Sequence, residues 1–354
     1  MYKRGIIVFS VFHLFFFSCS QKSVGEQSDL GFDKSISLNN GERLSLSDEI
    51  NRSSDMIIIN DKMVIADKDD EYYFKVFNIL EEKFEGDLGK IGEGPCEIGF
   101  PTYLQAVPNN FDDIGLVLKS NFGYQEMSLV SFDKSEESNC NNGIEKIAFD
   151  FMNYVKVADS LFIGTGIFQK KYASFKIGEQ SYEELAIDYP YLSAEMKSVP
   201  NSIPMSQQGK FRIKPGGKSI LFTHSSNPFF DILEIENNNI TLKFRMEGEA
   251  PDFIGSNSPK SMSAVMTDEN INGFISSSTT DNFIYLLYSG KTRNQGEEKY
   301  SNQVWVYDWD GNPIKKFLLD QEVNQIAVSP NDEFLISYHD NGKPNLTRYK
   351  LGGE

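Results

Sequence analysis

The sequence predicts an all-β fold, a six-bladed β-propeller with four strands in each blade. Short β-branched and aromatic segments recur between turns rich in Asn, Asp, Gly and Pro, a pattern typical of β-hairpins. Pairs of these hairpins repeat with a mean period of about 53 residues, and repeats of roughly 40–50 residues with four strands per unit indicate propeller blades. The units start near residues 56, 105, 154, 211, 274 and 323.

Closure of the ring requires strands from both ends of the chain. Only five complete outer hairpins are present, and the sixth unit has a single outer strand at residues 345–351. Its missing partner can come from residues 34–38 or from residues 42–46. Because strands from the two termini would then pair, no exposed sheet edge remains at the closure. We therefore place the propeller at residues 32–354.

An internal repeat supports the count of six units. The segment GEGPCEIG at residues 92–99 reappears as GEAPDFIG at residues 248–255, which is 156 residues later. This separation is close to three periods, and both copies follow an outer hairpin and precede an inner strand. We expect both copies to be tight links between blades. Neither copy has the Lys-Ser/Thr ending of a phosphate-binding loop.

The N-terminus predicts export. Lys3 and Arg4 are followed by an apolar run at residues 5–17. A short basic region and about 7–15 apolar residues describe a secretory signal, whereas a membrane-spanning helix needs about 20 residues. We expect a signal peptide at residues 1–18 and a flexible polar tether at residues 19–31.

Cys19 predicts a lipid anchor. Residues 16–19 (FFSC) resemble the lipobox of bacterial lipoproteins, with Phe in the first position instead of the usual Leu. Acylation of Cys19 would anchor the protein in the cell envelope, at the periplasmic or surface side of the outer membrane. The alternative is an ordinary cleaved signal in which Cys19 has no role.

Two further segments resemble a known family. Residues 89–101 (GKIGEGPCEIGFP) are similar to the G-x-x-G-x-G-P-x-E-F-x-x-P link of the TolB-like six-bladed propeller lipoproteins of Bacteroidota, and NHL-type propellers carry a similar link. Residues 304–313 (VWVYDWDGNP) resemble the family's penultimate hairpin. Cys96 replaces the usual Gly of the link, and Ile98 replaces the usual Phe. The resemblance covers about residues 50–350 and implies an exported six-bladed propeller without an established reaction.

The composition excludes several function classes. A formal net charge of -17 and a pI near 4.7 argue against a nucleic-acid-binding protein, which needs a clustered cationic face. The sequence contains no GxxxxGK[ST], HExxH, GxSxG or paired CxxC motif, and only three His and three Cys. We therefore expect a monomeric, non-catalytic binding protein without a cofactor.

The two histidines of the mature chain stand at equivalent places in their units. His224 and His339 end the second strands of units four and six, and Asp67, followed by Asp69 and Asp70, holds the same place in unit one. All would rim the link face, the face of the ring that carries the interblade links. Asp67, His224 and His339 there could hold a divalent metal, as in a metal-dependent hydrolase or lyase. The alternative is a set of solvated loop residues.

The link face is also predicted to carry the longest loops, at residues 188–209, 249–272 and 289–301. The first contains Tyr189 and Tyr191, and the third contains Lys291 and Arg293, while Lys170 and Lys171 add positive charge nearby. Long loops on a rigid scaffold commonly carry binding residues. We therefore hypothesise that this face binds a protein, a peptide or a glycan. The alternative is loop variation without function.

Overall fold

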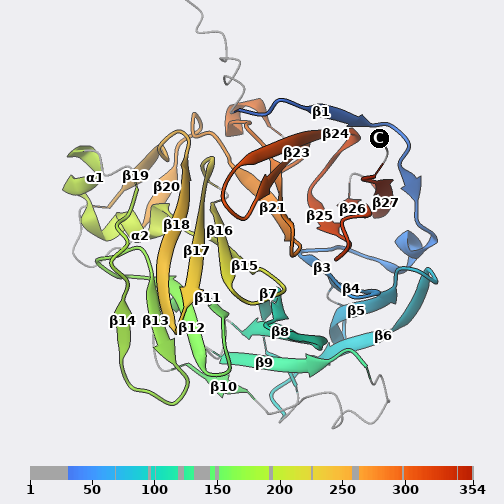
Figure 1. Cartoon of the computed structure of the whole chain (residues 1–354), viewed down its shortest axis with the longest axis horizontal. Helices are drawn as coiled ribbons and strands as arrows, with labels where there is room; N and C mark the ends of the chain where they lie inside the picture. The colour runs from blue at the N-terminus through green and yellow to red at the C-terminus, as the bar shows by residue number, and fades with distance from the viewer. Residues whose placement is uncertain are drawn as a thin grey trace, which may run out of the picture. The chain divides into compact units, whose positions relative to one another are not determined.

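A computed structural model of the chain describes residues 31–67, 69–94, 97–99, 101–118, 123–130, 144–147, 151–190, 194–224, 226–256, 263–296, 299–340 and 342–352. The predicted signal peptide, Cys19 and the predicted tether up to Leu30 lie outside the described residues. Phe32–Glu354 forms one compact unit. It is the predicted all-β, six-bladed propeller (Figure 1).

The first three blades are antiparallel sheets whose strands follow chain order. Blade 1 contains β3 (Met56–Ile59), β4 (Lys62–Ala66), β5 (Tyr72–Asn78) and β6 (Lys83–Lys90). Blade 2 contains β7 (Pro101–Val107), β8 (Asn110–Leu118), β9 (Gly123–Ser128) and β10 (Glu145–Lys146). Blade 3 contains β11 (Phe151–Lys156), β12 (Leu161–Gly166), β13 (Ala173–Lys176) and β14 (Tyr182–Glu184).

The other three blades complete the ring. Blade 4 contains β15 (Gly209–Ile213), β16 (Ser219–His224), β17 (Phe229–Glu236) and β18 (Asn239–Glu247). Blade 5 contains β21 (Phe274–Thr279), β22 (Phe283–Tyr288), β23 (Ser301–Asp308) and β24 (Pro313–Val323), with the 3₁₀ helix η4 (Arg293–Gln295) between β22 and β23. Blade 6 contains β25 (Gln325–Val328), β26 (Phe334–His339) and β27 (Asn345–Lys350).

Both N-terminal segments that were candidates for the closure are used, but only one closes blade 6. β2 (Glu42–Arg43) pairs antiparallel with β27 and supplies the missing fourth strand. β1 (Ser35–Leu38) pairs parallel with β24 and becomes a fifth strand of blade 5. After β2 the chain leaves the sheet as the 3₁₀ helix η1 (Ser45–Glu49), because Leu44 and Leu46 turn into the core.

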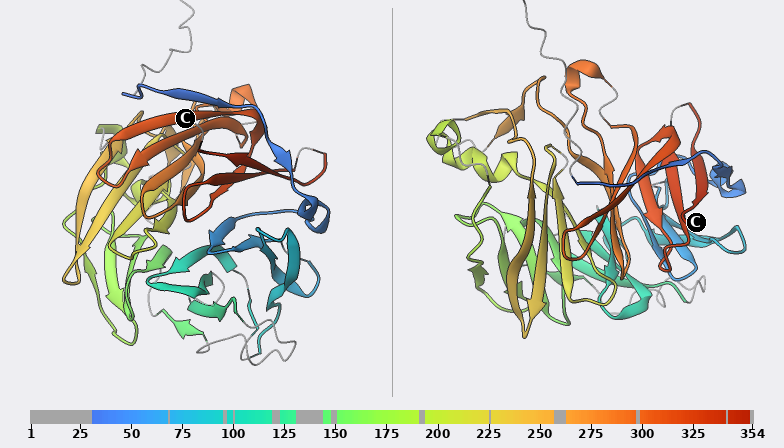
Figure 2. Two further views of the ribbon diagram at one scale, coloured as in Figure 1. Left: turned by 45° about the vertical axis from the view of Figure 1, so that its right-hand side comes forward. Right: turned by 45° about the horizontal axis from the view of Figure 1, so that its top comes forward.

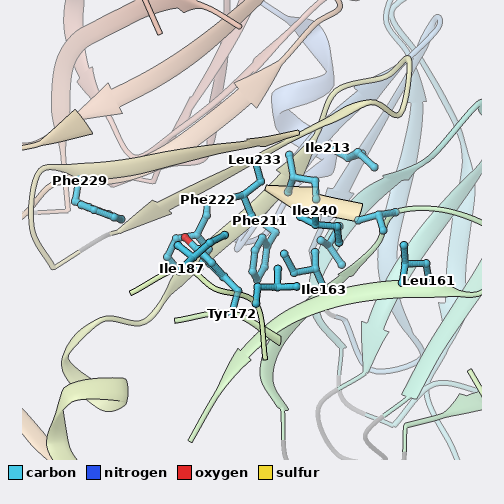
Figure 3. Close-up of a cluster of buried hydrophobic side chains, with 14 residues drawn as sticks. Leu161, Ile163, Tyr172, Ile187, Phe211, Ile213, Phe222, Phe229, Leu233 and Ile240 are labelled. Carbon is cyan, nitrogen blue, oxygen red and sulfur yellow. The ribbon is translucent and has the colours of Figure 1, made fainter. Parts of the chain in front are cut away.

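The hydrophobic core lies between neighbouring blades. Each blade buries both faces, and alternate residues of a strand point to opposite faces. Between blades 3 and 4, for example, Ile163 and Tyr172 of one blade pack against Phe211, Phe222 and Leu233 of the other (Figure 3). Similar clusters fill the interfaces between blades 1 and 2, 2 and 3, 5 and 6, and 6 and 1. Phe230 of blade 4 contacts the rings of Phe274 and Tyr307 of blade 5, so burial of apolar surface holds adjacent blades together.

The innermost strands are joined by hydrogen bonds that side chains make across the blade junctions. The first strands of neighbouring blades contact each other around the centre of the ring. Each of the six junctions has at least one such bond in the part of the chain that the structure describes. They are Asp55 to Leu104 N, Tyr103 to Tyr154 O, Asn153 to Gly209 O, Thr279 to Ile213 O, Ser276 to Ile326 N and Gln325 to Ser53 O.

Arg212 connects four blades at the centre. Its Nη2 donates to Oδ1 of Asp55 at 2.5 Å, its Nη1 to the carbonyl of Leu104 at 3.0 Å and its Nε to the carbonyl of Ser277 at 3.2 Å. Both side chains of the ion pair are buried. Burial raises the pKa of Asp55, but the positive charges of Arg212 and Lys210 outweigh it and hold that pKa below its ordinary value.

We expect Arg212→Met to lower the free energy of unfolding by about 3–5 kcal/mol, because it leaves the Asp55 carboxylate buried without its main partner. Urea denaturation at neutral pH measures this loss. Because the folded pKa of Asp55 lies below its unfolded value, the contribution of the pair is present above about pH 4 and disappears as the pH falls through the folded pKa.

Arg43→Met is the matched control, since the guanidinium of Arg43 bonds Asp48 at the surface. We expect this variant to change the free energy of unfolding by no more than about 0.5 kcal/mol. Equal losses in the two variants would contradict a central role for Arg212.

Candidate functional site

The two longest interblade insertions pack against each other at the link face. The first contains α1 (Ala194–Ser198), the 3₁₀ helix η3 (Pro200–Ser202) and α2 (Ile203–Ser206). The second contains a two-stranded ribbon of β19 (Phe253–Gly255) and β20 (Ala264–Met266). We call these five elements the insertion platform. Figures 1 and 2 show it beyond the ends of the strands of blades 3 and 4.

Close contacts fix the ribbon on the helices. α2 packs against β20, and the backbone N–H of Ser256 donates to Oγ of Ser202 at 3.0 Å. A Cβ atom at Gly255 would lie only 2.8 Å from Ser202 Oγ and from a methyl group of Val199, so only glycine permits this approach. Met196 and Ile203 are buried inside the platform. The two insertions therefore form one structural layer.

A buried lysine lies where the two insertions join blades 3 and 4. Lys171 follows β12 and is fully buried. Its Nζ lies 2.8 Å from Nε2 of His224 and 3.4 Å from Oε1 of Gln207. The ring centroids of Phe222 and Phe229 are 4.8 and 4.4 Å from the same nitrogen. Burial lowers the pKa of Lys171 to about 7.

The hydrogen bonds assign the tautomer of His224. Nδ2 of Asn227 donates to the carbonyl of Glu249 at 3.3 Å, which orients its amide so that Oδ1 faces Nδ1 of His224 at 2.7 Å. Nδ1 therefore carries the proton, and Nε2 accepts from Lys171. Burial and the neighbouring Lys171 hold the pKa of His224 well below its ordinary value, so the ring is neutral.

The nearest carboxylate does not serve as a counterion for Lys171. Asp231 is fully buried, and Arg245 binds it with two hydrogen bonds of 2.8 and 2.9 Å. The hydroxyl of Tyr172 donates to the same carboxylate at 2.6 Å. Asp231 raises the pKa of Lys171 and Arg245 lowers it, so burial decides the net direction.

One chain of hydrogen bonds therefore joins the two insertions through the lysine. Nε2 of Gln207 donates to the carbonyl of Pro190 at 3.0 Å, at the start of the first insertion. The chain continues through Lys171, His224 and Asn227 to the start of the second insertion. The expectation that Lys171 adds surface charge is wrong, because it is enclosed by aromatic rings. Only Lys170 reaches the surface, where it binds Asp188 at 2.5 Å.

The structure does not bring Asp67, His224 and His339 together as a metal site. Each ends or follows the second strand of its blade, as expected. However, Asp67 is buried and accepts the backbone N–H groups of Asn51 and Arg52, both at 2.8 Å. Among the described residues, no group of three or more His, Cys, Asp or Glu side chains has a geometry suited to a metal ion.

His339 is held within blade 6. Its Nε2 lies 3.0 Å from Nδ2 of Asn345 on the neighbouring strand. Burial lowers the pKa of His339, and its buried Nδ1 has no hydrogen-bond partner in the described ranges. The loop after Asp67 is likewise used locally, since Asp69 accepts the backbone N–H of Tyr72 at 2.6 Å, whereas Asp70 is exposed.

The other predicted binding residues are spread over the link face. The hydroxyl of Tyr189 donates to the carbonyl of Phe168 at 3.3 Å, and Tyr191 lies outside the described residues. Lys291 binds Glu322 at 2.7 Å. Arg293 is exposed in η4, next to Asn294.

The exposed aliphatic residues of the ribbon were not predicted from the sequence. Ile254 and Val265 stand directly opposite each other on β19 and β20 and are 69% and 59% exposed. A short apolar run in a predicted link is equally typical of a buried strand, so the sequence did not indicate that these side chains are exposed. The internal repeat gave no signal for this exposure, because Ile98, which holds the place of Ile254 in the first copy, is completely buried.

Comparisons with known proteins agree with this architecture. Residues 45–331 match the family model described as TolB-like 6-blade propeller-like. Comparison with curated proteins gives no match. None of the helices in the described part of the chain combines the length and apolar character needed to cross a membrane.

Comparison with solved structures finds similar chains at low identity. A DUF4221-family protein from Bacteroides vulgatus superposes with a TM-score of 0.51 at 10% identity, over 85% of this chain and 92% of that chain. The β-propeller domain of Cps50 (Swd1) from Myceliophteria thermophila gives a TM-score of 0.46 at 8% identity, over 88% of this chain and 98% of that chain. At 10% identity the likeness to the DUF4221-family protein concerns the fold alone.

The buried lysine predicts a dependence of stability on pH. The folded pKa of Lys171 is about 7, against about 10.5 when unfolded, so the unfolded state binds more protons between these values. The contribution of Lys171 to the free energy of unfolding should therefore rise by a few kcal/mol from pH 7 to pH 9, below the range in which the tyrosines of the unfolded chain ionise. Lys171→Met should flatten this rise and be at least as stable as the wild type at pH 7, because Met suits the aromatic enclosure.

Urea denaturation at a series of pH values measures this effect. Lys176→Met, at an exposed position, is the control and should keep the pH dependence of the wild type. An identical pH profile for Lys171→Met and the wild type would show that Lys171 titrates normally.

Proposed function

The chain belongs to the family of TolB-like six-bladed propellers, and on this premise we propose that it is an exported lipoprotein of a Bacteroidota cell envelope that binds a protein, peptide or glycan without catalysis. The binding surface in this proposal is the insertion platform on the link face. A membrane-bound propeller of this kind would hold its partner near the envelope.

One observation carries the proposal. The two longest insertions do not run separately over the surface but pack into one ordered layer, supported by the buried chain of hydrogen bonds through Lys171. Exposed Ile254 and Val265 stand on this layer. Several turns on the opposite face are short, such as the one between Ile59 and Lys62, whereas the connection between β9 and β10 spans residues 129–144. Loops positioned by a rigid scaffold are common binding sites.

The alternative of a metal-dependent hydrolase or lyase has less support. Asp67 uses both carboxylate oxygens on backbone N–H groups, and His224 uses both ring nitrogens within the protein. Lys171, whose pKa burial lowers to about 7, is fully buried. None of these three groups is placed to reach a substrate.

The proposed anchor predicts that Cys19→Ser moves the protein from the membrane fraction to the soluble fraction, because the acyl chains supply the membrane affinity. Detergent phase partitioning and cell fractionation measure the change. Cys96→Ser is the matched control and should stay in the membrane fraction. Unchanged partitioning of Cys19→Ser would contradict the anchor.

The proposed binding surface predicts where a partner can be cross-linked. A photoreactive phenylalanine analogue at Lys197 of the platform should give adducts of higher mass in cells, because Lys197 is exposed in the last turn of α1. The same analogue at Leu80, an exposed turn residue on the opposite face, should give none. Adducts from Leu80 alone would place the binding surface elsewhere.

A further inference from the structure

The ribbon of the insertion platform exposes an aliphatic pair. Ile254 and Val265 are cross-strand neighbours, and their exposures of 69% and 59% are high for aliphatic residues within ordered strands. The opposite face of the ribbon packs on the helices, since Gly255 contacts Val199 and Ser202. Because alternate residues point to opposite faces, the outward face carries Asp252, Ile254, Val265 and Thr267.

The internal repeat shows that this exposure is not a property of the motif. Ile98 holds the same place in the first copy, where it is completely buried in the core between blades 1 and 2. Its segment forms a parallel bridge with Ile91. In the second copy the chain extends into the ribbon, and the equivalent Ile254 faces solvent.

The ribbon also presents unpaired strand edges. Its sheet consists of β19 and β20 alone, so the outer backbone groups of both strands are outside any ladder in the described part of the chain. An exposed edge with aliphatic side chains is a template for an added strand. Folded proteins normally protect such edges with lysines or prolines at the edge.

The charge around the ribbon selects the chemistry of the partner. Five exposed acidic residues flank it, and the described stretches 246–256 and 263–270 contain no Lys or Arg. The acidic residues are Glu247, Glu249, Asp252, Asp268 and Glu269. The exposed cations close by include Lys197 of α1 and Arg293, whose neighbour Asn294 binds Glu269. A second copy of this chain would bring like charges together, whereas a basic segment would be attracted.

We propose that the β19–β20 ribbon is the docking site for an extended, basic polypeptide segment with aliphatic side chains, which adds to the ribbon as a further strand. The inference rests on the proposed function and specifies the partner for that surface. The aliphatic side chains of the segment pack on Ile254 and Val265, and its basic side chains meet the carboxylates around Asp252.

A synthetic probe tests this directly. A fluorescein-labelled hexapeptide of alternating Lys and Val has aliphatic side chains on one face and cations on the other when extended. Fluorescence anisotropy should show saturable binding to the purified propeller. Ile254→Asn/Val265→Asn should weaken it about tenfold. Hydrogen exchange should show slower exchange of ribbon amides in the presence of the peptide.

Two controls separate docking from general attraction to an acidic protein. Leu80→Asn removes an equally exposed aliphatic side chain, 72% exposed, and should leave binding unchanged. An alternating Lys-Gly peptide has the same charge and should bind more weakly. Equal binding of both peptides, equal binding to the ribbon variant, or no binding would each overturn the inference. Platform cross-links from Lys197 would still support the proposed function in that case.

Discussion

The propeller depends on one constraint: backbone ladders end at the edges of each blade, so side chains must hold the six sheets together. Apolar faces supply most of this cohesion, but they do not fix the distance between innermost strands at the centre. The ion pair of Arg212 and Asp55 does so, because the guanidinium reaches the inner strands of blades 2 and 5 as well as its carboxylate beside blade 1. The side-chain bonds at all six junctions extend the same principle around the ring.

A second buried polar group, Lys171, supports the loops of the link face. Lys171 is enclosed by aromatic rings and lacks a carboxylate of its own, since Arg245 occupies Asp231. Such burial costs stability whenever the lysine is charged. In return its hydrogen bonds connect both insertions to blade 4. A buried polar network of this kind orients surface elements more specifically than apolar contacts, which have no direction.

The internal repeat illustrates how a link between blades becomes a surface of its own. In the first copy the link is short, and Ile98 returns to the core before the next blade begins. In the second copy the chain continues as β19, and the same position becomes the exposed Ile254. An isolated two-stranded ribbon is at best marginally stable in water. Packing on α2 therefore stabilises this ribbon. The blades themselves are unchanged by the insertion, because it lies outside their ladders.

The amino-acid sequence by itself determined the fold class, the count of six blades and the use of the N-terminus for closure, since period-2 hydrophobicity and turn residues act locally along the chain. Only the tertiary structure decided which N-terminal segment joined which blade, because residues 35–38 and 42–43 have similar strand patterns and differ in the edges they meet. The same holds for Lys170 and Lys171, adjacent and chemically identical residues of which one is on the surface and one is buried. Asp67, His224 and His339 occupy equivalent places in their blades. Each nevertheless forms hydrogen bonds with different nearby residues, which are Asn51, Lys171 and Asn345, respectively. Burial and hydrogen-bond partners come from segments far apart in the chain, and no local pattern contains that information.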